Sequence, residues 1–136
     1  MKTITTYLVE DSAVIRESLI ATLEELSEVK VIGTAEDESS ATRWLLEPGN
    51  QPDLVIIDLF LKTGTGLGVL KSVRDQMHDS TMVVLTNYAT PDMRQKCLSL
   101  GATRVFDKSH DVDALILYCN QLAAGEHDGS GSRLLQ

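Results

Sequence analysis

The feature that most constrains this chain is an alternation, repeated about five times, between a short apolar run and a longer segment of helical periodicity. The apolar runs are rich in β-branched residues and stop at polar side chains, which is typical of buried strands. The intervening segments place apolar residues every three or four positions, which indicates amphipathic helices. A strand–helix alternation of this kind predicts an α/β fold with a mostly parallel, doubly wound sheet of five strands, covered on both faces.

The element boundaries follow from where each pattern starts and stops. The expected strands span residues 4–9, 29–34, 53–57, 81–85 and 103–106. The expected helices span residues 12–26, 39–46, 67–77, 91–100 and 111–124. The apolar positions of the first helix are Ile15, Leu19, Leu23 and Leu26. We expect one domain over residues 1–124 and a flexible tail over residues 125–136, because the tail lacks any periodicity.

Composition and charge exclude several classes of protein. The formal net charge of −8 argues against a direct nucleic-acid partner, since phosphate backbones are bound by clustered Lys and Arg. No run approaches the roughly 18 apolar residues of a membrane span, and the N-terminus lacks the pattern of a signal peptide. We therefore expect a cytoplasmic protein without a membrane partner. Cys97 and Cys119 have no metal-binding or redox spacing, so we expect two buried thiols.

Reactive side chains stand at the carboxyl ends of four expected strands. In an open parallel sheet, ligands bind beyond these ends, near the point where the strand order reverses. The residues at these ends are Glu10 and Asp11 after the first strand, Asp58 after the third, Thr86 after the fourth and Lys108 after the fifth. Taken singly, each has an ordinary structural explanation, such as a helix cap, a turn or a solvated lysine. Their joint placement favours a common site.

Three carboxylates at one edge of a sheet repel one another, so their negative charge must be balanced by cations. Two unit charges about 4 Å apart cost roughly 4 kcal/mol at an effective dielectric near 20. Oxygen ligands without His or Cys favour Mg²⁺, or Mn²⁺, over zinc. A divalent cation together with Lys108 would balance the carboxylates and a phosphoryl group in transfer. Asp58 is then a competent nucleophile toward phosphorus, and Thr86 offers a hydroxyl to a phosphoryl oxygen.

The chain resembles the response-regulator receiver family over about residues 3–124, and five segments carry the resemblance. They are Leu-Val-Glu-Asp-Ser at 8–12, Asp-Leu-Val-Ile-Ile-Asp-Leu-Phe-Leu at 53–61, Gly-Thr-Gly-Leu at 64–67, Val-Val-Leu-Thr-Asn-Tyr at 83–88 and Gly-Ala-Thr-Arg-Val-Phe-Asp-Lys-Ser at 101–109. The resemblance implies a flavodoxin-like sheet of order 2-1-3-4-5.

The resemblance also implies a role for each site residue. Asp58 would accept the phosphoryl group, and Thr86 and Lys108 would hold its oxygens. Asp11 would bind Mg²⁺ directly and Glu10 through water. Asp58 and the backbone carbonyl of Phe60 would complete the metal site.

The sequence departs from the family pattern at three positions. Lys62 and Ser109 stand where proline is frequent, and Val105 stands where the family usually has a switch aromatic. A valine has little rotamer freedom, so the usual relay is in question. Tyr88, two residues after Thr86, is the nearest alternative carrier of the signal.

The function implied by the resemblance is that of a signalling receiver, not an enzyme. It would take a phosphoryl group from a histidine kinase or phosphotransfer protein, switch a protein-binding face and then dephosphorylate. Two alternatives stay open: a receiver belonging to a longer DNA-binding regulator, with residues 129–132 starting a linker, and a binding module that works without phosphorylation. A dehalogenase-type phosphatase needs a second Asp where Phe60 stands, and an acidic pair after the first strand would repel a flavin phosphate.

A partner surface is expected on the last helix. Ala114, Leu117 and Tyr118 lie off the face predicted to pack on the sheet, and they are more apolar than solvent requires. We expect an output protein or a second copy to bind through the last two helices and the fifth strand. The alternative is a wide core stripe that buries these residues.

Overall fold

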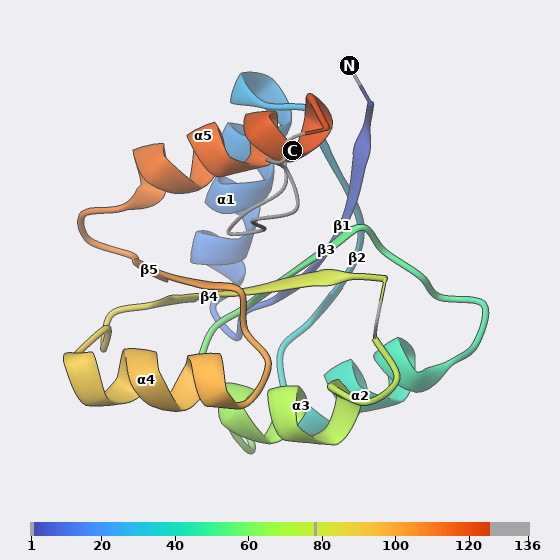
Figure 1. Ribbon diagram of the computed structural model, residues 1–136, viewed down its shortest axis with the longest axis vertical. Coiled ribbons are helices and arrows are strands. Elements are labelled where there is room, and N and C mark those ends of the chain that lie inside the picture. Colours follow the sequence, from blue (N-terminus) through green and yellow to red (C-terminus); the bar gives the residue numbers. More distant parts are fainter. Residues whose placement is uncertain (1, 78, 126–136) are drawn as a thin grey trace, which may run out of the picture.

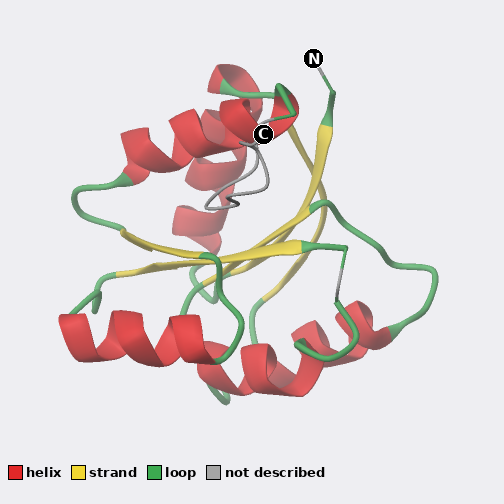
Figure 2. Cartoon of the chain, viewed as in Figure 1, coloured by secondary structure: helices red, strands yellow, loops and turns green. Residues whose placement is uncertain are grey.

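The computed structural model describes residues 2–77 and 79–125, which form one parallel sheet of five strands in the order β2-β1-β3-β4-β5 (Figures 1 and 2). The strands are β1 Ile4–Val9, β2 Val29–Ala35, β3 Leu54–Ile57, β4 Thr81–Thr86 and β5 Arg104–Asp107. The helices are α1 Ala13–Leu26, α2 Glu38–Leu46, α3 Gly66–Val73, α4 Pro91–Ser99 and α5 Val112–Ala123. The doubly wound fold and its strand order are confirmed. The expected tail beyond residue 125 lies outside the described residues.

The two faces of the sheet carry separate cores. In Figure 1, α1 and α5 lie above the sheet and α2, α3 and α4 below it. The central strand β3 supplies both cores, because Leu54 and Ile56 pack toward α1 and α5 while Val55 and Ile57 pack toward the other three helices. All four side chains are buried, as the continuous apolar strand predicts.

Four of the helices begin at a side-chain cap. In each, a hydroxyl or carboxylate accepts the backbone N–H three residues later, which satisfies one otherwise unpaired donor of the first turn. The caps are Ser12, Asp37, Thr65 and Thr90. Four of the strand-to-helix connections at the carboxyl edge of the sheet are short, while the one from β3 to α3 spans residues 58–65.

Some sequence expectations are wrong in detail. The third helix ends at Val73 and not at residue 77, because the chain tightens into turns in which the Gln76 N–H donates to the Val73 carbonyl at 2.9 Å. Met77 is nevertheless buried. In α1 only Leu19 and Leu23 reach the core, while Ile15 and Leu26 are 38% and 54% exposed.

The prediction that Tyr118 lies on a second, exposed face of α5 is also wrong. Tyr118 is 3% exposed and belongs to the core. Its ring lies 5.8 Å from that of Phe106, and Arg104 stacks over it at 5.0 Å. Ala114 and Leu117 stay exposed as expected. The two cysteines are buried free thiols, also as expected. Across residues 2–77 and 79–125, none of the helices has the length and apolar character that crossing a bilayer requires.

An aromatic stack closes the outer end of the lower core. Tyr7 of β1 and Trp44 of α2 lie face to face, with ring centroids 4.0 Å apart and planes 6° from parallel. The edge strand passes close by at Gly33, where an added Cβ would lie 2.9 Å from Cε1 of Tyr7. A side chain at this position would therefore push the stack apart.

We predict that Gly33→Ala lowers the free energy of unfolding by about 1–3 kcal/mol, the usual cost of overpacking a filled core. The measurement is urea denaturation followed by the fluorescence of Trp44, the one tryptophan in the sequence. Gly49→Ala is the matched control, because nothing lies within 4 Å of a Cβ there. Equal stability of the two variants would contradict this account.

Candidate functional site

Four of the predicted site residues meet at the carboxyl edge of the sheet. Lys108 Nζ lies 2.5 Å from Oε1 of Glu10 and 2.9 Å from Oδ2 of Asp58. One carboxylate oxygen from each of Glu10, Asp11 and Asp58 lies within 4.8 Å of the others. Glu10 and Asp58 are 1% and 8% exposed, whereas Asp11 is half-buried.

The backbone at the ends of β1 and β3 places the acidic residues. The N–H of Glu10 donates to Ala35 and the N–H of Asp58 to Val9, both at 2.9 Å, so the ladder continues up to the site. Oε2 of Glu10 accepts the N–H of Ser12 at 3.0 Å. The cap of α1 is Ser12, so neither acidic residue is needed as a helix cap.

The loop after Asp58 turns back tightly against it. The N–H of Gly66 donates to the Leu59 carbonyl at 2.8 Å. A Cβ at Gly66 would lie 2.2 Å from the carbonyl oxygen of Asp58, which leaves space for glycine alone. This close approach starts α3 next to Asp58 and fixes the path of the loop that carries Phe60.

Burial and charge shift the proton affinities of the site in a consistent way. Burial raises the pKa of Glu10, and hydrogen bonds from Lys108 and the Ser12 N–H offset only part of this rise. Burial alone would lower the pKa of Lys108, but its hydrogen bonds to Glu10 and Asp58 and the charges of both carboxylates raise it above its usual value. Lys108 is therefore held as a cation between the two acids.

Thr86 closes β4 and is fully buried. Its Oγ1 accepts the N–H of Tyr88 at 3.1 Å, and a hydroxyl in this role keeps its own proton to donate. Its carbonyl accepts the N–H of Lys108 at 2.9 Å. Thr86 and Lys108 are thus bound to each other through the backbone.

Two exposed aromatic rings stand beside the site. Phe60 and Tyr88 are 50% and 56% exposed, and their ring centroids lie 4.5 Å apart at an angle of 60°. This contact joins the loop after Asp58 to the loop after Thr86. The metal-binding role of the Phe60 carbonyl stays a prediction.

Two arginines next to the site were missed from the sequence. Arg16 donates from Nη1 to the carbonyl of Glu10 at 2.7 Å and lies 3.8 Å from Glu36. Arg94 binds the backbone of two other segments at this end of the sheet. Neither arginine belongs to a sequence motif. Each lies on the polar side of a helix, and its partners are backbone carbonyls, which a side-chain pattern does not predict.

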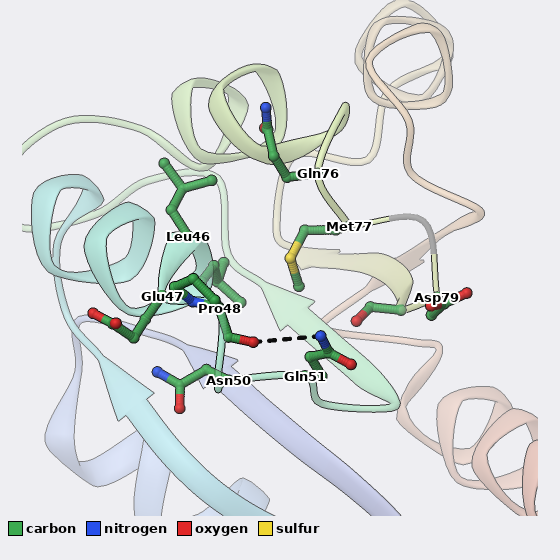
Figure 3. Close-up of a pocket in the computed structure, with 10 residues that line it drawn as sticks. Leu46, Glu47, Pro48, Asn50, Gln51, Gln76, Met77 and Asp79 are labelled. Atoms are coloured by element: carbon green, nitrogen blue, oxygen red, sulfur yellow. Dashed lines mark hydrogen bonds between the residues drawn. The ribbon is translucent and has the colours of Figure 1, made fainter.

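The arrangement suits a small hard cation and a tetrahedral anion. The oxygens of Glu10, Asp11 and Asp58 are the ligands that Mg²⁺ prefers, and one oxygen from each lies within 4.8 Å of the others. A separate hollow of about 290 Å³ lies at the amino ends of β3 and β4, where Gln51 donates to the Pro48 carbonyl (Figure 3). Its lining contains none of the four residues that meet at the carboxyl edge.

A flavodoxin-like sheet with an acidic cluster and a lysine at its carboxyl edge defines the class of protein, and comparison with known proteins gives the family. The model of the response regulator receiver domain matches residues 6–120. The chain therefore belongs to the receiver domain family of two-component response regulators. This is a signalling family.

The curated relatives are bacterial regulators. The transcriptional regulatory protein YdfI of Bacillus subtilis is 30% identical over 116 residues, which is 80% of this chain and 53% of that protein. The transcriptional regulatory protein LiaR of Bacillus subtilis is 30% identical over 95 residues, which is 70% of this chain and 44% of that protein. The chain thus spans about half the length of the relatives it matches.

The solved structures agree on the fold. A two-component response regulator of the LuxR family from Aurantimonas sp. SI85-9A1 superimposes with a TM-score of 0.80 at 25% identity, covering 93% of this chain and 89% of that one. A response regulator from Burkholderia pseudomallei, solved with a phosphorylated aspartic acid, a calcium ion and citrate, has a TM-score of 0.74 at 20% identity, covering 90% and 69%.

We predict that Lys108→Met lowers the free energy of unfolding by about 3 kcal/mol at pH 7 without divalent cations, because it leaves buried carboxylates without their partner. Lys108 lowers the pKa of Glu10, so its removal lets Glu10 take up a proton more readily, and the loss should shrink as the pH falls. Urea denaturation at pH 7 and pH 5 measures both effects. Lys71→Met, at an exposed position of α3, is the control. A loss that is the same at both pH values would contradict the proposed charge balance.

Proposed function

We propose that this receiver accepts a phosphoryl group on Asp58 and later releases it by hydrolysis. The observation that carries the proposal is the Lys108 ammonium, which bridges Asp58 and Glu10 beside the more open carboxylate of Asp11. A buried aspartate with a fixed cation on one side and an acidic cluster on the other suits in-line transfer at phosphorus. The Burkholderia pseudomallei protein with a phosphorylated aspartic acid has the same fold.

The residues of the chain divide the chemistry among them. A carboxylate oxygen of Asp58 forms the new P–O bond while the P–N bond to a donor imidazole breaks, and the electron pair leaves with the ring nitrogen. Lys108 binds Oδ2 of Asp58 and keeps the side chain oriented toward the opening. The Lys108 ammonium and the Thr86 hydroxyl then donate to the phosphoryl oxygens. Hydrolysis breaks the P–O bond and restores the carboxylate.

Glu10, Asp11 and Asp58, with the backbone carbonyl of Phe60, would hold the metal, which we propose to be Mg²⁺, with Mn²⁺ as a substitute. When bound, this cation neutralises charge on the phosphoryl oxygens. Asp11 is the more exposed carboxylate of the cluster and suits direct coordination, while Glu10 is already bonded to Lys108 and suits a contact through water.

The phosphoryl donor in this proposal is a histidine kinase or phosphotransfer protein, and the protein acts in the cytoplasm. The output is contact with another protein or a second copy through α4, β5 and α5, where Leu98 and Leu117 are 49% and 59% exposed. The chain matches only about half the length of the transcriptional regulators named among the relatives, which favours a longer DNA-binding regulator as the second candidate. A phosphorylation-independent binding module would need none of the charge balance at Asp58.

We predict that incubation with a small acyl phosphate and Mg²⁺ adds one phosphoryl group to the protein and none to Asp58→Asn, because the amide is not a nucleophile toward phosphorus. Intact mass spectrometry measures the addition. Asp53→Asn is a matched control, since Asp53 precedes the same strand at its opposite end. Undiminished labelling of Asp58→Asn would move the acceptor elsewhere.

We predict that Asp11→Asn weakens Mg²⁺ binding by at least about tenfold, because even outer-shell partners of a metal contribute roughly 10–100-fold. Glu10→Gln should weaken binding less, since its contact is expected to run through water. Isothermal titration of Mg²⁺ into the three metal-free proteins compares them. Wild-type affinity in Asp11→Asn would contradict the proposed ligand set.

A further inference from the structure

The Arg94 side chain joins three segments that are far apart in the sequence. Its Nε donates to the carbonyl of Ala89 at 3.0 Å, in the loop between β4 and α4. Its Nη1 donates to the carbonyl of Val105 in β5 at 2.8 Å, and its Nη2 lies 3.6 Å from Oδ2 of Asp111, the residue before α5. All three guanidinium nitrogens therefore face an acceptor in another segment. Arg94 itself belongs to α4.

These acceptors bracket the two residues expected to hold the phosphoryl oxygens. Ala89 lies three residues after Thr86, whereas Val105 and Asp111 lie three residues before and after Lys108. Oδ2 of Asp111 also accepts the N–H of Asp107 at 2.9 Å, next to Lys108 in the chain. A shift of either phosphoryl-binding residue therefore acts on a segment to which Arg94 is bonded.

The side chain of Val105 is poorly suited to transmit a change from the site to α4 and α5. It is 8% exposed and packed in the lower core, and a β-branched residue has little rotamer freedom. It has no ring to rotate between solvent and interior. The backbone carbonyl of this same residue, however, is bound by Arg94.

Arginine suits this position better than other cations. Its planar guanidinium carries five donors in a fixed fork, so one side chain can hold three acceptors in fixed relative directions. A lysine ammonium keeps the charge but, as a compact group on a flexible stem, it cannot reproduce the fork. The Arg94 side chain is 40% exposed, so its replacement should disturb the core less than a buried substitution would.

We propose that Arg94 is a positioning residue that keeps the Thr86 loop and the Lys108 loop in register with α4 and α5, and that it transmits phosphoryl binding to these helices. The proposal rests on the proposed function of Asp58. When Thr86 and Lys108 close on a phosphoryl group, the segments at Ala89, Val105 and Asp111 move with them. Arg94 then couples this movement to α4, the helix to which it belongs, and through Asp111 to the start of α5.

The experiment uses the whole chain with beryllofluoride and Mg²⁺ as the phosphoryl mimic. NMR amide shifts of residues 91–99 and 112–123 report the helices, and a titration gives the apparent affinity of the mimic. We expect Arg94→Met to weaken the mimic about fivefold or more, which is the lower end of measured coupling between sites. We expect Arg94→Lys to bind the mimic but to lose at least about half of the shift changes in both helices, again within that range of coupling.

Two controls separate coupling from general damage. Lys96→Met removes an exposed cation from the same helix and should leave affinity and shifts unchanged. Val105→Ala keeps the carbonyl that Arg94 binds and should preserve the shift changes. Urea denaturation of each variant shows whether it is folded, and Arg94→Lys decides the question if Arg94→Met is not.

The outcomes are distinct. Wild-type affinity and shifts in both Arg94 variants would overturn the role of Arg94 and leave the proposed function intact. Loss of the helix shifts in Val105→Ala but not in Arg94→Lys would also overturn it. A wild-type protein that fails to bind the mimic would refute the proposed function first, and the role of Arg94 with it.

Discussion

The ion pairs of Lys108 are the interaction on which the site depends. Glu10 and Asp58 are brought close together in a nearly dry setting, where two carboxylates repel strongly. Lys108 comes from the strand at one end of the sheet and reaches the carboxylates of β1 and β3 across the end of β4. Burial still raises the pKa of Glu10, and the hydrogen bonds from Lys108 and the Ser12 N–H offset only part of this rise.

The strand order makes this interaction available. With β1 and β3 adjacent at the centre, their ends place Glu10, Asp11 and Asp58 together, and β4 and β5 supply Thr86 and Lys108 from the next positions. The edge strand β2 contributes no ligand, and its Gly33 lets the Tyr7–Trp44 stack close the core instead. Side-chain caps then begin four of the helices at this edge of the sheet.

Two arginines also hold the loops around the site through main-chain oxygens. Arg16 holds the carbonyl of Glu10, and Arg94 holds those of Ala89 and Val105. Side-chain charges bound to backbone carbonyls fix where a loop runs without adding charge to the reacting group. Arg16 belongs to α1 and Arg94 to α4, so these two helices are bonded directly to the loops around the site.

The sequence by itself determined the strand–helix alternation, the doubly wound class and the placement of Asp58, Thr86 and Lys108 at strand ends, which share one edge in a parallel sheet. Family resemblance supplied the strand order, which the periodicity alone left open. Tertiary structure decided which members of an apolar stripe are buried: Tyr118 enters the core against Phe106, while Ile15 and Leu26 stay exposed. It also decided the contacts of Arg16 and Arg94, whose partners are backbone carbonyls. Periodicity assigns a side chain to a face of its own element, but burial and hydrogen bonding depend on the neighbouring element that packs there, and that pairing is made only when the chain folds.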